Sequence, residues 1–294
     1  MQYFLSIFIF LFGSALGSFI TVISNRYNTG LPFLKGRSIC FSCGARLQSK
    51  DLFPVFSFLF LRGRCRYCKG KIPKEALIAE LVMGCLSVLA AFKSGLFSLD
   101  LRALPAQAGW SLEAGMTYLA ITSIFAVILL ISIYDLKHFI IPDSFLISLF
   151  VFSFIYLLIP FIYHPPAQAG FLALSLSRFL AAFIVTLPFL LIFLVSRGRW
   201  IGFGDIKYML VLGFLLGLSQ GASAIMMAFW IGAFFSLSAL SLKYLKSHLS
   251  LPSSVNNLTI KSEIPFGPFI SLGIILSIWL DIDFLQIQSL FYVF

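Results

Sequence analysis

Two pairs of cysteines lie in the most polar stretch of the sequence, residues 24–75. Each pair has the spacing Cys-x-x-Cys, with Cys40 and Cys43 in the first pair and Cys65 and Cys68 in the second. Two such pairs can present four sulfur atoms tetrahedrally, and four thiolates are a common structural zinc site. The alternatives are free thiols or two disulfides, which need an oxidising compartment. We expect zinc, because a loop of about 50 residues with few large aliphatic side chains needs such a staple to fold.

Acidic residues are scarce, and the positions of two of them, Asp135 and Asp205, suggest chemistry. Asp135 ends an apolar run, where the dipole of a helix C-terminus opposes a negative charge. Asp205 follows Gly202-Phe203-Gly204, and the two glycines let the backbone come close to another group. Asp143, in contrast, follows a proline and opens an apolar run, which is the pattern of a helix N-cap.

Two carboxyl groups in one low-dielectric pocket share a proton, because both cannot ionise. In an aspartic protease the ionised member activates water and the protonated member polarises the substrate carbonyl. A transporter coupled to protons or cations would also use carboxylates within the membrane. Asp135 and Asp205 are the candidate pair. Glu80, which interrupts another apolar run, is either a further functional acid or the partner of a basic residue in the preceding loop.

The elements that must position these residues are apolar segments. Of the 294 residues, 60% are hydrophobic and 11% are charged, whereas soluble proteins carry about 25% charged residues. One membrane crossing needs about 20 helical residues. The run at 208–242 is too long for one crossing, so we expect a break at Ser219-Gln220-Gly221. We predict an all-α polytopic membrane protein with about eight transmembrane segments, at 3–23, 76–92, 114–134, 144–163, 179–196, 208–219, 222–242 and 264–280.

Basic residues are distributed unevenly between the loops that join these segments. With the N-terminus outside, 18 of the 21 Lys and Arg residues fall on one side, against Lys93, Arg102 and Arg178 on the other. The positive-inside rule places the richer side, with the cysteines and both aspartates, in the cytoplasm. The net charge of +10 then reflects topology, and we expect contact with membrane lipid but not with nucleic acid. The expected parts are a first transmembrane segment (1–23), a cytoplasmic four-cysteine domain (24–75) and a membrane-embedded body (76–294).

Two smaller features have a structural and a functional interpretation. Gly13 and Gly17 have the GxxxG spacing at which membrane helices pack closely, and we favour helix packing over a ligand site. Lys207, two residues after Asp205, either helps to hold a substrate and tune Asp205 or anchors its segment at the cytoplasmic face.

The sequence as a whole resembles the type IV prepilin peptidase family, whose members are bacterial leader peptidases and N-methyltransferases. The resemblance rests on residues 37–44 and 61–68 around the cysteines, and on 135–143, 202–207 and 264–268. It implies a membrane aspartyl endopeptidase that uses Asp135 and Asp205 to cleave the leader peptides of type IV prepilins and pseudopilins at the cytoplasmic side of the inner membrane. It also implies methylation of the new N-terminus with S-adenosyl-L-methionine, whose binding residues are unknown.

Two other classes of function stay open on the residues alone. One is an ion-coupled membrane transporter with intramembrane carboxylates, and the other is a non-catalytic membrane adaptor that binds a partner through its zinc domain. Transporters built from internal repeats often contain paired broken segments. Only one short segment is expected in this sequence, which disfavours transport.

Overall fold

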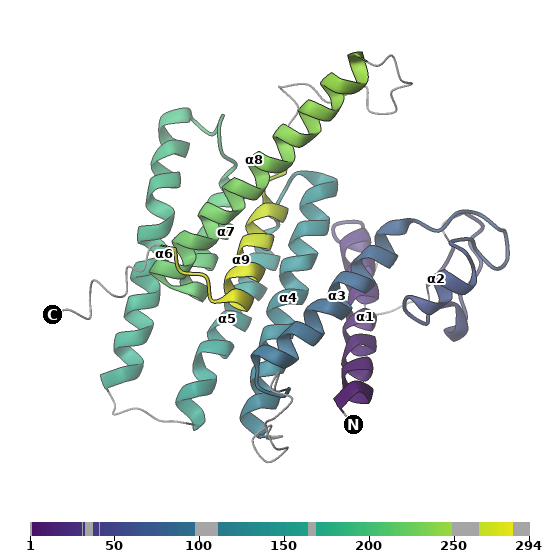
Figure 1. The fold of residues 1–294 in the computed structure, drawn as a ribbon, viewed down its shortest axis with the longest axis horizontal. Coiled ribbons are helices and arrows are strands. Elements are labelled where there is room, and N and C mark those ends of the chain that lie inside the picture. The colour runs from purple at the N-terminus through teal and green to yellow at the C-terminus, as the bar shows by residue number, and fades with distance from the viewer. Residues whose placement is uncertain are drawn as a thin grey trace. The chain divides into compact units, whose positions relative to one another are not determined.

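The computed structural model describes residues 2–30, 32, 38–40, 42–97, 111–163, 169–248 and 265–284. Within these ranges the regular structure is helical, with two isolated β-bridges and no strand. The elements in chain order are α1 (Gln2–Arg26), the 3-10 helix η1 (Ser49–Asp51), α2 (Phe56–Phe60), α3 (Lys74–Lys93), α4 (Leu112–His138), α5 (Asp143–Tyr163), α6 (Ala169–Ser196), α7 (Phe203–Leu216), α8 (Leu218–His248) and α9 (Gly267–Leu280) (Figure 1).

Each of the eight predicted apolar segments corresponds to one helix. Among the described residues, α1, α3, α4, α5, α6 and α8 are long and apolar enough to cross a membrane. α7 and α9 have 14 residues each. At 1.5 Å per residue that is about 21 Å, which is shorter than a hydrocarbon core of about 30 Å. The chain is therefore a multi-pass helical membrane protein, as predicted. The expectation of a single short segment was wrong, because α9 is as short as α7.

The break in the long apolar run lies at Gly217, and our prediction of Ser219-Gln220-Gly221 was wrong by a few residues. Gly217 separates α7 from α8 with a φ of +80°, in a region that favours glycine. Arg178 of α6 donates from Nη1 to the Leu215 carbonyl over 2.9 Å. This bond satisfies one of the carbonyl groups that a helix end leaves without a partner. The polar residues that we expected to break the helix lie in the first turn of α8.

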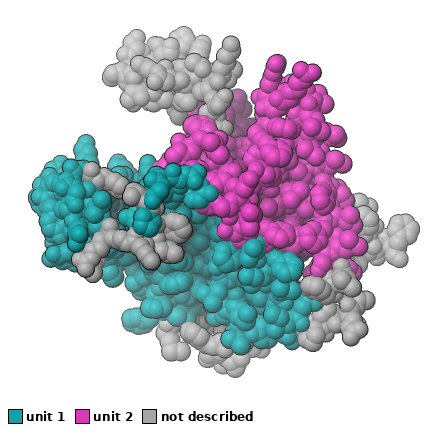
Figure 2. Space-filling view, turned by 180° about the vertical axis from the view of Figure 1, so that it is seen from behind, with its two compact units in different colours: residues 1–133, 151–165 teal, residues 134–150, 166–294 magenta. Residues whose placement is uncertain are grey.

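The described helices form two compact units, drawn in teal and magenta in Figure 2. Unit 1 comprises residues 1–133 and 151–165, and unit 2 comprises residues 134–150 and 166–294. The four paired cysteines lie in unit 1, and Asp135 and Asp205 both lie in unit 2. The two kinds of chemistry suggested by the sequence thus belong to different units.

In unit 1, α1 packs against α3 at its two spaced glycines. A Cβ at Gly13 would lie 2.7 Å from the Met83 carbonyl oxygen, and one at Gly17 would lie 2.8 Å from the Ala79 carbonyl carbon. Both separations are too short for any side chain, so the glycines let the two backbones touch. Their interpretation as a helix-packing notch is confirmed.

Glu80 of α3 is buried in unit 1, where its carboxylate has a structural partner. Its Oε2 accepts a hydrogen bond from the backbone N–H of Val55 over 2.7 Å. Val55 directly precedes α2, and it is itself buried. The bond fastens the polar segment to the second turn of α3. Glu80 thus binds a backbone group of the preceding segment, and not one of the basic residues that the sequence offered as possible partners.

In unit 2, α7 is the most deeply buried helix. Tyr208, Met209 and Leu212 are fully buried, and α6, α8 and α9 pack against α7 (Figure 1). A Cβ at Gly213 would lie 2.8 Å from Ala182 Cα, so this glycine lets α6 approach closely. Three neighbouring helices enclose α7, and this short helix is therefore surrounded mainly by protein.

Candidate active site and metal site

Asp135 lies near the end of α4, with only 4% of its surface exposed. Its Oδ2 accepts a hydrogen bond from the backbone N–H of Gly267 over 3.0 Å. Gly267 is the first residue of α9. The N-terminus of a helix carries a partial positive charge and free N–H groups, which bind anions. The start of α9 therefore supplies the compensation that Asp135 lacks at the C-terminal end of its own helix.

Gly267 also explains why the carboxylate can come so close to the backbone of α9. A Cβ at this position would lie 2.6 Å from Asp135 Oδ2 and 3.2 Å from its Cγ. Any side chain at residue 267 would push the carboxylate away. The sequence showed the segment 264–268 only as part of the family resemblance, and its contact with a residue 132 positions away could not be read from spacing.

Asp205 is the third residue of α7 and is partly exposed. Gly202 caps the helix, and a Cβ on it would approach Asp205 Oδ2 to 3.3 Å. Asp205 lies near enough to Asp135 to be affected by the charge of its carboxylate. The structure thus brings together two acids that are 70 positions apart in the sequence, within a single unit.

Asp143 and Lys207 form an ion pair beside this site. The pair links the first turn of α5 to the second turn of α7, and Lys207 also lies 5.1 Å from the centre of the Phe203 ring. α5 begins at Asp143, and Pro142 is the N-cap because its carbonyl accepts the first bond of the helix, from Leu146. The N-cap prediction for Asp143 was therefore wrong. Its side chain pairs with Lys207, for which the sequence allowed either a role at the substrate site or a role as an anchor at the cytoplasmic face.

Tyr208 and Ser271 are polar residues of this site that sequence reasoning missed. The Tyr208 hydroxyl lies 2.9 Å from Ser271 Oγ, and both residues are buried. Ser271 Oγ donates to the Gly267 carbonyl over 2.8 Å. The available signal was helical spacing, since Tyr208 follows Asp205 by three residues and Ser271 follows Gly267 by four. Residues three or four apart share one helix face.

The sulfur atoms of Cys40, Cys43, Cys65 and Cys68 all lie within 4.8 Å of one another. Cys40 Sγ and Cys68 Sγ are 3.8 Å apart, and all four cysteines are free. A disulfide has an S–S distance of about 2.05 Å. In a tetrahedral site with metal–sulfur bonds of about 2.3 Å, neighbouring sulfurs are about 3.8 Å apart. The donor set and its spacing therefore fit a tetrahedral metal ion, and no disulfide is present.

The two cysteine pairs share one backbone design. In the first, Cys40 N–H donates to the Ala45 carbonyl; in the second, Cys65 N–H donates to the Gly70 carbonyl, again five residues on. The turn of each pair includes one residue with positive φ, Gly44 in the first and Lys69 in the second. Equivalent loops can point their sulfurs at a common centre.

Electrostatics in this cluster favour the thiolate of Cys40 and oppose that of Cys68. Backbone N–H groups of Ser42 and Cys43 lower the pKa of the Cys40 thiol to about 6. A backbone bond from Gly70 favours the Cys68 thiolate, but desolvation and the neighbouring cysteine sulfurs prevail and raise its pKa to about 11. Several adjacent thiolates need a cation to balance their charge. A metal ion bound at the centre would provide it.

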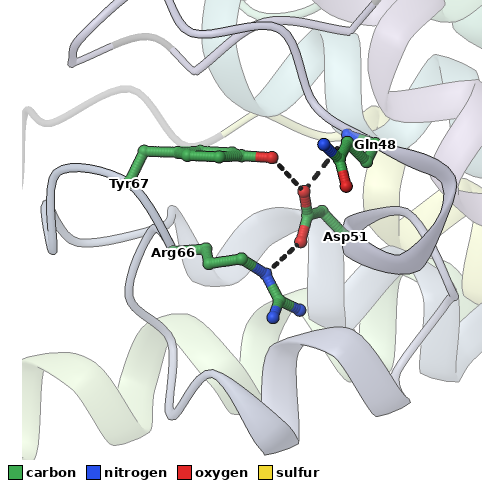
Figure 3. Close-up of polar contacts among 4 residues, drawn as sticks. All are labelled: Gln48, Asp51, Arg66 and Tyr67. Carbon is green, nitrogen blue, oxygen red and sulfur yellow. Dashed lines mark hydrogen bonds and ion pairs between the residues drawn. The ribbon is translucent and has the colours of Figure 1, made fainter.

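Asp51 ties the two cysteine pairs together (Figure 3). Its carboxylate accepts bonds from the Gln48 backbone N–H (3.1 Å), from Arg66 Nε (2.6 Å) and from the Tyr67 hydroxyl (3.1 Å). Gln48 follows the first pair, while Arg66 and Tyr67 lie within the second. Burial favours the neutral acid, but these bonds and the Arg66 charge together hold the pKa of Asp51 below its usual value.

Two family models match the chain. The bacterial peptidase A24 N-terminal domain matches residues 11–94, and the type IV leader peptidase family matches residues 121–237. The first range includes the four cysteines and Glu80, and the second includes Asp135 and Asp205.

Relatives of known name are similar over most of the chain. The prepilin leader peptidase/N-methyltransferase of Bacillus subtilis is 28% identical over 269 residues, which is 92% of each protein. The protein of the same name from Aeromonas hydrophila is 24% identical over 93% of this chain and 90% of its own. The Klebsiella pneumoniae protein is 27% identical over 71% of this chain and 84% of its own. No solved structure matches the chain.

Proposed function

Because the chain belongs to the type IV leader peptidase family, we propose that it cleaves the leader peptides of prepilins and pseudopilins with Asp135 and Asp205 as the catalytic pair. The observation that supports this assignment is the proximity of Asp205 to Asp135 within unit 2. One of them is buried and is held by the N-terminus of a third helix. The third described acid in the family's matched range, Asp143, is exposed and forms an ion pair with Lys207.

The chemistry follows from two adjacent carboxyl groups that share one proton. The ionised carboxylate takes a proton from water as the water oxygen attacks the scissile carbonyl carbon. The protonated carboxyl group gives its proton to the carbonyl oxygen, which yields a tetrahedral diol. When the C–N bond breaks, the leaving amine takes up the proton gained from water, and the diol returns the other proton to the second aspartate.

The short α7 supports this mechanism. Three helices cover it, and its N-terminal turn carries Asp205. A site that excludes bulk water strengthens the electrostatic interactions within it and protects the reacting groups. The turn between α4 and α5 adds cover, because a Cβ at Gly204 would lie 3.4 Å from Ile141 Cβ.

We propose that Cys40, Cys43, Cys65 and Cys68 hold a structural zinc ion in a cytoplasmic domain at 24–75, because their number, type and spacing suit it. The relatives also carry N-methyltransferase in their names. By analogy this chain methylates the new N-terminus, and S-adenosyl-L-methionine supplies the methyl group when bound. The described residues single out no group for binding this donor.

We propose that the protein lies in the inner membrane, and the distribution of its basic residues supports a cytoplasmic position for its cysteine domain and aspartates. Its expected partners are prepilin and pseudopilin substrates and membrane lipid, without nucleic acid.

Purified protein in detergent, incubated with a prepilin, tests the main activity. The product should lose its leader peptide, as read from its new N-terminus, and its mass should increase by one methyl group if the donor is added. An intact prepilin after incubation with folded protein would contradict the proposal, and would return the ion-coupled transporter and the adaptor to consideration.

A further inference from the structure

The hydrogen bonds of unit 2 point to a positioning role for two residues outside the catalytic pair. We propose that Tyr208 and Ser271, acting through Gly267, hold the Asp135 carboxylate in its reactive position. The proposal rests on the assigned function, since it explains how one member of the catalytic pair is held.

Three hydrogen bonds in series connect α7 to Asp135. The Tyr208 hydroxyl and Ser271 Oγ are 2.9 Å apart, and Ser271 Oγ donates to the Gly267 carbonyl over 2.8 Å. A serine hydroxyl has one proton, and Ser271 uses it for Gly267, so Tyr208 donates in the first bond. Gly267 N–H then donates to Asp135 Oδ2 over 3.0 Å. The chain begins one turn after Asp205 and ends on its catalytic partner.

The burial of these groups shows that the bonds are needed. Tyr208 is 0% exposed and Ser271 is 2% exposed. A buried hydroxyl without a partner is unfavourable, and polar residues within a membrane body are costly and are often functional. The Tyr208 hydroxyl fixes the N-terminal part of α9 relative to α7, and the first turn of α9 carries the N–H that binds Asp135.

This arrangement positions the N–H of Gly267 accurately against the Asp135 carboxylate. Gly267 has no side chain that could guide α9, and its N–H must lie within hydrogen-bond reach of Asp135 while its Cα stays in contact with the carboxylate. Because a misplacement of about 1 Å at a reacting group can lower a rate about a hundredfold, a small shift of α9 should reduce turnover and leave substrate binding unchanged.

Unit 1 contains a matched control for this bond. Ser87 of α3 and Tyr118 of α4 also form a buried hydroxyl–hydroxyl bond, of 2.8 Å. Tyr118→Phe and Tyr208→Phe therefore remove the same kind of bond from the same kind of helix contact. Only Tyr208 is connected to a catalytic residue.

The test measures kcat and KM for prepilin cleavage in Tyr208→Phe, Ser271→Ala, the double variant, Tyr118→Phe and Asp135→Asn. We expect Tyr208→Phe and Ser271→Ala to lower kcat about tenfold with KM changed less than about twofold. The double variant should resemble Ser271→Ala, because Tyr208 acts through Ser271 and the two effects are coupled. Tyr118→Phe should keep kcat within about twofold of the wild type. It should lower the melting temperature about as much as Tyr208→Phe does, because each variant loses one buried hydroxyl–hydroxyl bond.

Two results would overturn the proposal. One is equal kcat for Tyr208→Phe and Tyr118→Phe, and the other is a double variant whose loss is the product of the two single losses. Asp135→Asn separates this inference from the function on which it rests. If that variant cleaves normally, the catalytic assignment fails. If it is inactive while Tyr208→Phe and Ser271→Ala are fully active, the positioning role alone fails.

Discussion

Gly267 and Gly115 are both helical glycines, but their surroundings differ. A Cβ at Gly267 would lie 2.6 Å from Asp135 Oδ2, whereas one at Gly115 would meet no atom within 4 Å. We predict that Gly267→Ala displaces the carboxylate and lowers prepilin cleavage at least about a hundredfold. Gly115→Ala should leave cleavage unchanged, since alanine also favours a helix. A cleavage assay on folded protein checks this, and equal activity in both variants would contradict it.

Glu80 is the residue that anchors Val55 to α3. Glu80→Leu leaves the buried Val55 N–H without its acceptor, which costs about 1–3 kcal/mol. Glu80→Gln keeps an acceptor oxygen at the same place and should be milder. Thermal unfolding in detergent would show the difference as a lower melting temperature for Glu80→Leu. The structural role is refuted if the two variants melt together with the wild type.

The sequence was informative about residues whose side chains can bind a metal ion or transfer protons. The four cysteines could be recognised from their spacing, Asp135 from a position that capping does not explain, and Asp205 from the two glycines that precede it. Their partners could not be recognised. The contact of Gly267 with Asp135, the bond of Tyr208 to Ser271 and the pairing of Asp143 with Lys207 each join segments at least 63 positions apart. Such contacts depend on how helices pack, and periodicity within one segment contains no information about that.

At the scale of elements, the apolar runs predicted the helices well because a membrane crossing has a fixed length and composition. The boundary between α7 and α8 was predicted less well. Serine and glutamine in the run suggested a break, but the chain turns at Gly217, where a positive φ is available and Arg178 reaches the open carbonyl of Leu215. Polarity alone does not end a helix when the backbone bonds can continue.

The cysteine domain is the element whose stability should depend on a ligand. We predict about one zinc ion per chain, since four thiolates complete its coordination. Chelation or Cys65→Ser should increase hydrogen exchange within 38–72, while α3, α4 and α8 keep their protection because their bonds are internal to each helix. Elemental analysis of protein purified without chelator gives the first result. Substoichiometric zinc, or unchanged exchange after its removal, would contradict the prediction.

At the scale of the whole molecule, the orientation of the chain is the main prediction. A reporter active only in the periplasm should be active when fused at Gly109 or Ala169, and silent at Lys50 or Ser253, because the basic loops stay in the cytoplasm. The fusion at Ser253 is the decisive one. Activity there would mean that α7 and α8 together cross the membrane once, and the eight-segment arrangement would be wrong.

The catalytic pair is the central claim, and single Asp→Asn substitutions test it most directly. Asn keeps the shape of each side chain but cannot share or accept the proton. Asp135→Asn and Asp205→Asn should each lower kcat/KM for prepilin cleavage about a thousandfold or more, in protein that melts like the wild type. Asp143→Asn, at a nearby exposed acid paired with Lys207, should retain cleavage within about tenfold. Near-normal cleavage by Asp135→Asn or Asp205→Asn, or loss of cleavage only in Asp143→Asn, would contradict the aspartyl mechanism proposed for this site.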